Sequence, residues 1–101
     1  MAFDLYAGDV RESIHPHEEF LFSLAAERSG RYPALLGVWE SFYKDPQMHP
    51  DQAGACVHEI IDLLSSNGGL ANRPLATVAF RLLLFFSSAY RNGKAVKCSS
   101  D

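Results

Sequence analysis

Apolar residues recur with helical spacing in four segments of this chain, and a proline stands at the start of each. Pro16, Pro33, Pro50 and Pro74 occupy the position that proline tolerates in the first turn of a helix. The pattern predicts helices over residues 16–29, 33–44, 50–66 and 74–92. The second is the most regular, with apolar residues at Leu35, Leu36, Trp39, Phe42 and Tyr43.

The two ends of the chain follow a different period. Phe3-Asp4-Leu5-Tyr6 alternates between apolar and polar residues, and Ala95-Val96-Lys97-Cys98 does so more weakly. Two short strands are expected, and they could pair with each other if they pack on the helices. The expected fold is therefore mainly α: one four-helix bundle-like domain over residues 1–101, with a short two-stranded ribbon formed by the termini.

The composition fits a single folded domain. The chain has 101 residues, of which 48% are hydrophobic, and its formal net charge of −3 is too small for a disordered chain of this apolar content. Two cysteines cannot form a disulfide framework, so the core must stabilise the fold.

The small net charge is the difference between two unlike parts. Residues 1–62 contain eleven acids and four bases, a sum of −7, whereas residues 63–101 contain five bases and one acid, a sum of +4. The simplest interpretation is that the two parts attract each other within one fold. An acidic molecule without a basic stripe is not expected to bind nucleic acid.

The sequence predicts a cytoplasmic protein that does not enter the membrane. The first twenty residues have no apolar core of a secretory signal. The most apolar stretch, from Leu75 to Phe86, is too short for a membrane span and contains Arg81. We expect Arg81 to pair with an acid such as Asp62 or Glu59, because an unpaired buried charge is very costly. Alternatively, it marks a surface groove. Cys56 and Cys98 are expected to be reduced.

The segment His58-Glu59-Ile60-Ile61-Asp62 is the strongest candidate for chemistry. It resembles the helical zinc motif of metalloproteases, with Asp62 in place of the second histidine. A third ligand would have to come from His15, His17, His49 or a distant carboxylate. A small metal-dependent hydrolase is therefore one hypothesis, and a solvated helix face is the simpler alternative. For His15, His17, Glu18 and Glu19, capping of the first helix explains the cluster more simply than a metal does.

Other catalytic signatures are missing from the sequence. No serine lies in a nucleophile elbow, no phosphate-binding loop is present, and Cys56 belongs to an apolar stripe. We therefore expect a protein that is not an enzyme and needs no cofactor.

Seven segments together form a pattern that covers most of the chain: Leu5-Tyr6-Ala7-Gly8-Asp9, His17-Glu18-Glu19, Tyr32-Pro33-Ala34-Leu35-Leu36, Trp39-Glu40-Ser41-Phe42-Tyr43, His49-Pro50-Asp51-Gln52, the segment from Glu59 to Leu64, and the segment from Ala89 to Asp101. With this pattern the chain resembles the small helical immunity-type proteins found beside bacterial polymorphic toxins.

The resemblance implies a cytoplasmic protein that binds a cognate toxin, for example a basic nuclease, and blocks its active site. An acidic protein would associate quickly with such a partner by electrostatic steering. The segment from Asp45 to Asp62 is the expected contact surface, and its partner-binding candidates are Tyr43, Asp45, His49, Asp51, Gln52, His58, Glu59 and Asp62. Trp39 is a further candidate anchor, although a core position is the simpler interpretation. A third hypothesis is a regulatory module in which the fourth helix forms a homodimer face.

Overall fold

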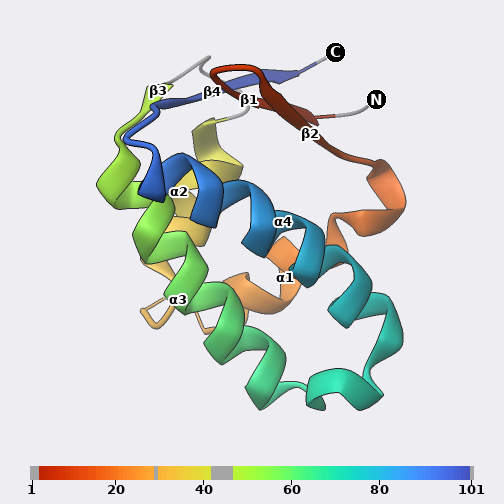
Figure 1. Cartoon of the computed structure of the whole chain (residues 1–101). Coiled ribbons are helices and arrows are strands. Elements are labelled where there is room, and N and C mark those ends of the chain that lie inside the picture. The colour runs from red at the N-terminus through yellow and green to blue at the C-terminus, as the bar shows by residue number, and fades with distance from the viewer. Residues whose placement is uncertain (1–2, 29, 42–46, 101) are drawn as a thin grey trace.

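Helices and strands both contribute to the fold. The computed structural model describes residues 3–28, 30–41 and 47–100. Within them the elements run in the order β1 (Phe3–Ala7), β2 (Val10–Ile14), η1 (Pro16–Glu18), α1 (Phe20–Ala26), α2 (Pro33–Ser41), β3 (Gln47–Met48), α3 (Pro50–Ser66), η2 (Gly69–Ala71), α4 (Arg73–Arg91) and β4 (Val96–Ser100). Figure 1 shows the strands together at the top of the view and the helices below them.

The expected mainly α bundle is wrong, because the described residues form a mixed fold with four α-helices and a four-stranded antiparallel sheet. The strand order is β2-β1-β4-β3. The terminal segments do pair, with Leu5 opposite Cys98, but they form the centre of the sheet rather than a separate ribbon. Strands β2 and β3 extend that pair on either side.

Strand β2 was missed because its sequence, Val-Arg-Glu-Ser-Ile, has no regular apolar alternation. A local signal was nevertheless present in Gly8-Asp9, a two-residue connection typical of a tight hairpin. Gly8 has a φ of 61°, a conformation that favours glycine, and Ala7 pairs with Val10 across the turn. Strand β3 has only two residues, too few to show a period.

The sheet has one apolar face and one polar face. Buried residues from all four strands share the apolar face and join the helices in one core; they include Phe3, Leu5, Ala7, Ile14, Met48, Val96 and Cys98. Asp4, Tyr6, Arg11 and Ser13 lie on the other face by strand alternation. This arrangement is typical of an antiparallel sheet covered on one side.

The helix expected over residues 16–29 is shorter than predicted and is divided. A 3-10 turn, η1, precedes α1, and α1 ends at Ala26. Phe22 is buried on α1, where its ring stacks on that of Trp39 with centroids 5.0 Å apart. The rings of Trp39 and Phe3 also pack edge to face, so Trp39 lies at the margin of the core, between the sheet and the helices.

Helices α3 and α4 form an antiparallel hairpin joined by η2, and they make the most extensive helix–helix contact of the fold (Figure 1). One side of α4 is buried, with Leu75, Ala79, Leu82 and Phe86 recurring at helical spacing. None of the described helices is both long and apolar enough to cross a membrane.

Candidate functional site

The candidate residues from the sequence are not gathered in one place. Tyr43 and Asp45 lie outside the described residues. His49 and Gln52 lie at the start of α3, where the Gln52 side-chain oxygen accepts a hydrogen bond from the His49 N–H at 2.8 Å. Gln52 therefore stabilises the helix end, which leaves its amide less free to recognise a partner.

Glu59 caps a neighbouring helix. Its two carboxylate oxygens accept hydrogen bonds from the backbone N–H groups of Ala34 and Leu35, each at 3.0 Å. These amides belong to the first turn of α2, whose N–H groups have no partner within the helix. The carboxylate also complements the positive end of the α2 dipole. Glu59 is thus a structural residue.

Asp62 has a structural role as well. Its carboxylate accepts hydrogen bonds from the Tyr32 hydroxyl and from Arg31 Nη2, both at 2.8 Å, and Arg31 Nε lies 2.8 Å away. The hydrogen bond from Tyr32 lowers the pKa of Asp62, and Arg31 adds to that effect. Asp62 therefore ties the loop before α2 to α3.

His58, Glu59 and Asp62 do not converge on a common point. Glu59 and Asp62 face α2 and the loop before it, whereas His58 lies on the side of α3 that faces α4. Among the described residues, no group of three or more histidine, cysteine, aspartate or glutamate side chains is placed to hold a metal ion.

Two of the predicted residues, Asp51 and His58, line the same pocket between α3 and α4. The pocket has a volume of about 340 Å³. It is completed by Gly54, Ala55 and Val57 from α3 and by Ser87 and Tyr90 from α4. Asp51 and His58 are seven residues apart, so they share one face of α3 about 10 Å apart along its axis.

Gly54 shapes this pocket. A Cβ atom at residue 54 would lie 2.7 Å from Cδ1 of Tyr90, closer than side-chain atoms normally approach. The absence of a side chain therefore lets the Tyr90 ring lie directly against the α3 backbone, although glycine costs helix stability. Sequence reasoning missed Gly54, Ser87 and Tyr90. The available signal was a glycine within an otherwise regular helical stripe.

The α3–η2–α4 hairpin exposes several large apolar side chains. Seven large hydrophobic side chains are exposed among the described residues, and five of them lie on α3, η2 or α4: Ile61, Leu70, Phe80, Leu84 and Tyr90. Leu84 is 74% exposed. Helical spacing puts Ile61 on the face of Gly54 and His58, and Leu84 on the face of Phe80 and Ser87. We call these five residues the hairpin surface.

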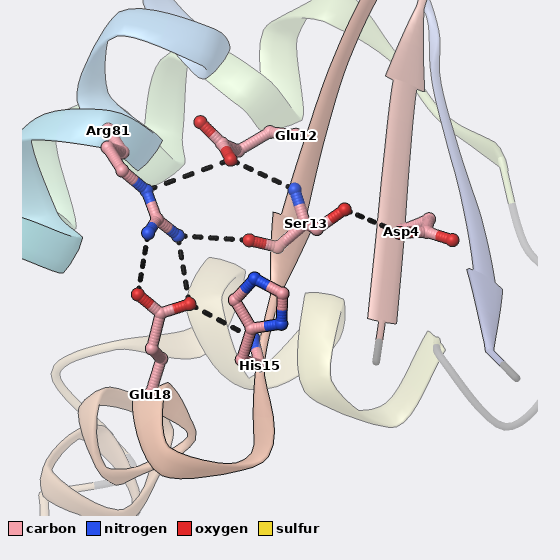
Figure 2. Close-up of polar contacts among 6 residues, drawn as sticks. All are labelled: Asp4, Glu12, Ser13, His15, Glu18 and Arg81. Atoms are coloured by element: carbon pink, nitrogen blue, oxygen red, sulfur yellow. Dashed lines mark hydrogen bonds and ion pairs between the residues drawn. The ribbon is translucent and has the colours of Figure 1, made fainter. Parts of the chain in front are cut away.

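Arg81 of α4 holds β2 and η1 against the helix (Figure 2). Its guanidinium donates to both carboxylate oxygens of Glu18, at 2.6 and 3.0 Å, and to the Ser13 carbonyl oxygen at 3.0 Å. Its Nε lies 3.7 Å from Glu12. The expected pairing with Asp62 or Glu59 is wrong, because those acids face α2. This cluster of polar contacts joins β2 and η1 to α4 and has a structural role.

The cluster continues from Ser13 across the sheet to Asp4 (Figure 2). The Ser13 hydroxyl donates to Asp4 at 2.6 Å, and Arg11 lies 3.2 Å from the same carboxylate. The hydrogen bond from Ser13 lowers the pKa of Asp4, against the opposing effect of burial. At Glu18, burial raises the pKa, but hydrogen bonds from Arg81 and the His15 N–H outweigh it and leave the pKa lowered.

These lowered pKa values predict a loss of stability in acid. A carboxyl whose pKa is lower in the folded state stabilises the protein above its unfolded pKa and loses that effect as the pH falls through the folded value. The free energy of unfolding should be constant near neutral pH and fall below about pH 4. Denaturant titrations at a series of pH values measure this, and the Asp4→Asn variant should show a shallower decline. Equal slopes for the two proteins would contradict the assignment of Asp4.

Neither cysteine has the environment of a nucleophile. Cys56 and Cys98 are both free and buried. Burial raises the pKa of Cys98 to about 11, and burial together with the charge of Glu59 raises the pKa of Cys56 further. Both thiols therefore stay protonated at neutral pH and act as small apolar core residues.

Comparisons with known proteins gave no relative. No family model, curated protein or solved structure matches the chain. The pocket and the hairpin surface are the features that indicate a binding function.

Proposed function

We propose that this chain is a non-enzymatic, cytoplasmic binding protein that recognises a basic partner protein, in its most specific form a bacterial toxin that it neutralises. The observation that carries the proposal is the hairpin surface: five large apolar side chains are exposed on α3, η2 and α4, and one of them, Tyr90, lines a pocket with Asp51 and His58. Exposed large apolar residues that include aromatic side chains are typical of protein interfaces.

The charge distribution supports a basic partner. Helix α3 contains Asp51, Glu59 and Asp62 and has no lysine or arginine. Glu59 and Asp62 are engaged within the fold, whereas Asp51 makes no hydrogen bond or ion pair with the rest of the described chain. An acidic group beside an apolar surface would attract a basic protein during its approach and would then fix its orientation in the complex.

The other two hypotheses draw less support from the geometry. A hydrolase that uses His58, Glu59 and Asp62 would need these side chains to converge, and in the structure they face different neighbours. A homodimer through α4 would use the same exposed residues as a partner protein. The salt dependence of binding separates these alternatives, because a purely apolar dimer has no steering charge.

The test uses the purified product of the adjacent gene and co-expression of both proteins in cells. We expect the two proteins to bind, with a Kd that rises with salt concentration, and we expect cells that express the toxin to survive. Replacing both Ile61 and Leu84 with alanine should weaken binding about thirtyfold, the effect of losing an interface anchor worth about 2 kcal/mol.

The matched control is Val10→Ala, which shortens an exposed apolar side chain next to the turn between β1 and β2 and outside the hairpin surface. Its affinity should equal that of the unmodified protein. A neighbouring gene that encodes no toxin, together with no rescue of toxin-expressing cells, would refute toxin neutralisation. Equal losses in the control and the double variant would refute the assigned surface.

A further inference from the structure

We infer that the α3/α4 pocket is a receptor for a guanidinium group, in which an arginine side chain of the partner lies on the Tyr90 ring and donates to the Asp51 carboxylate. The inference rests on the proposed function for the identity of the partner, but the chemistry of the pocket stands on its own residues. In this arrangement, Asp51 of α3 and Tyr90 of α4 make the most specific contact with the partner.

The lining of the pocket favours a cation. Asp51 contributes a full negative charge, Ser87 a hydroxyl that can accept a hydrogen bond, and Tyr90 an aromatic ring. Within the part of the chain that the structure describes, no lysine or arginine lines the pocket; Arg91 follows Tyr90 in sequence but is not among the lining residues. The His58 imidazole also lines the pocket, but among the described residues no ion pair joins it to Asp51, so the Asp51 carboxylate remains available to a guest.

The position of Tyr90 makes its ring available. One part of the ring lies against the α3 backbone at Gly54, and yet 52% of the residue remains exposed. Contact with the backbone holds the ring in place, and because Tyr90 also lines the pocket, a guest there can reach it. Cations stack on the faces of aromatic rings, and arginine does so more often than lysine.

The helix dipoles do not reverse the preference of the pocket for a cation over an anion. The pocket lies near the N-terminal end of α3, which favours anions, and near the C-terminal end of α4, which favours cations. Each end carries a charge equivalent of about one half, and the two oppose each other. The full charge of Asp51 therefore decides which ion is favoured.

Arginine is preferred over lysine by shape as well. The guanidinium is planar, so it can stack on Tyr90 while two of its N–H groups point to one carboxylate. A pocket of about 340 Å³ has room for a side chain of this size. A lysine ammonium would satisfy Asp51 but would stack poorly on the ring.

The test is an NMR titration of the isolated protein with N-acetyl-arginine amide, compared with the citrulline analogue, which has the same shape and no charge. We expect chemical-shift changes at Gly54, His58, Ser87 and Tyr90, with citrulline binding about tenfold more weakly. Asp51→Asn should weaken arginine binding about tenfold, and Tyr90→Leu about fivefold.

The matched control is Glu27→Gln, which removes one exposed carboxylate beside Asn67, at the far end of α3 and about 20 Å from Asp51. It should bind arginine as the unmodified protein does. Equal binding of arginine and citrulline, shifts with inorganic phosphate but not with arginine, or an unchanged affinity in Asp51→Asn would each overturn the guanidinium assignment.

The two proposals can fail separately. If the isolated protein binds arginine at the pocket and no toxin is neutralised, the site stands and the proposed function falls. If the toxin is bound but Asp51→Asn and Tyr90→Leu do not weaken that complex, the function stands and the site is refuted as part of the interface.

Discussion

Replacing Arg81 with methionine should lower the free energy of unfolding by about 2–3 kcal/mol. The substitution leaves the Glu18 carboxylate, in a residue only 4% exposed, without its cation and without two hydrogen bonds. Removing one partner of a buried ion pair costs about 3–5 kcal/mol, and the expected loss is smaller here because about a third of the Arg81 side chain is exposed. The same change also removes the hydrogen bond to the Ser13 carbonyl.

Denaturant unfolding of Arg81→Met, Glu18→Gln, the double variant and the control Arg73→Met checks this prediction. Arg73→Met removes an exposed arginine from the first turn of the same helix and should change stability by less than about 0.5 kcal/mol. Adding Glu18→Gln to Arg81→Met should recover part of the loss, because the stranded charge is then gone. Strictly additive effects of the two substitutions would show that Arg81 and Glu18 do not act as a pair.

Replacing Glu59 with alanine should destabilise the protein by about 2 kcal/mol. The variant loses two charge-assisted hydrogen bonds to the amides of Ala34 and Leu35, and the first turn of α2 is left without its acceptor. The cost of losing a helix cap is about 0.5–2 kcal/mol, and a carboxylate that accepts two bonds belongs at the upper end of that range.

Amide hydrogen exchange reports on this cap directly. In Glu59→Ala, the N–H groups of Ala34 and Leu35 should exchange faster than in the unmodified protein, while amides in the middle of α4 change little in relative protection. Glu40→Ala, an exposed glutamate on α2 itself, is the matched control and should leave both amides protected. Unchanged exchange at residues 34 and 35 would refute the capping role.

The case of Glu59 shows why part of the candidate site was misread. Glu59 lies beside His58 and near Asp62, a spacing that matches a helical metal-binding motif. That spacing does not show which element packs against α3. In the folded chain the Glu59 carboxylate faces the start of α2. There was one indirect signal: Tyr32 precedes Pro33 and is not a capping residue, so the α2 amides needed an acceptor from elsewhere.

The charge asymmetry of the sequence has a structural counterpart. Arg81 belongs to the basic part of the chain and binds Glu18 and Glu12 from the acidic part. This is the attraction between the two parts that the sequence suggested. The sequence could not name the partners, because residues 1–62 contain eleven acids and only the packing of β2 and η1 against α4 selects among them.

The sequence by itself determined the features that depend on neighbouring residues. Proline positions and apolar spacing indicate the starts of α2, α3 and α4 and their buried faces, because helix periodicity and capping act over a few residues. The alternation at Phe3–Tyr6 likewise marks a strand. Each of these signals depends on residues that are close together in the sequence, so a single sequence is enough to detect it.

The tertiary structure decided which distant segments meet. It placed β2 and β3 beside the paired termini, gave Arg81 to Glu18, turned Glu59 and Asp62 toward α2, and brought Tyr90 against Gly54. Apart from the β1–β2 pairing, these contacts join residues that are tens of positions apart, and their selection depends on the packing of the whole core. The α3/α4 pocket is therefore a product of the fold, although Asp51 and His58 could be named in advance.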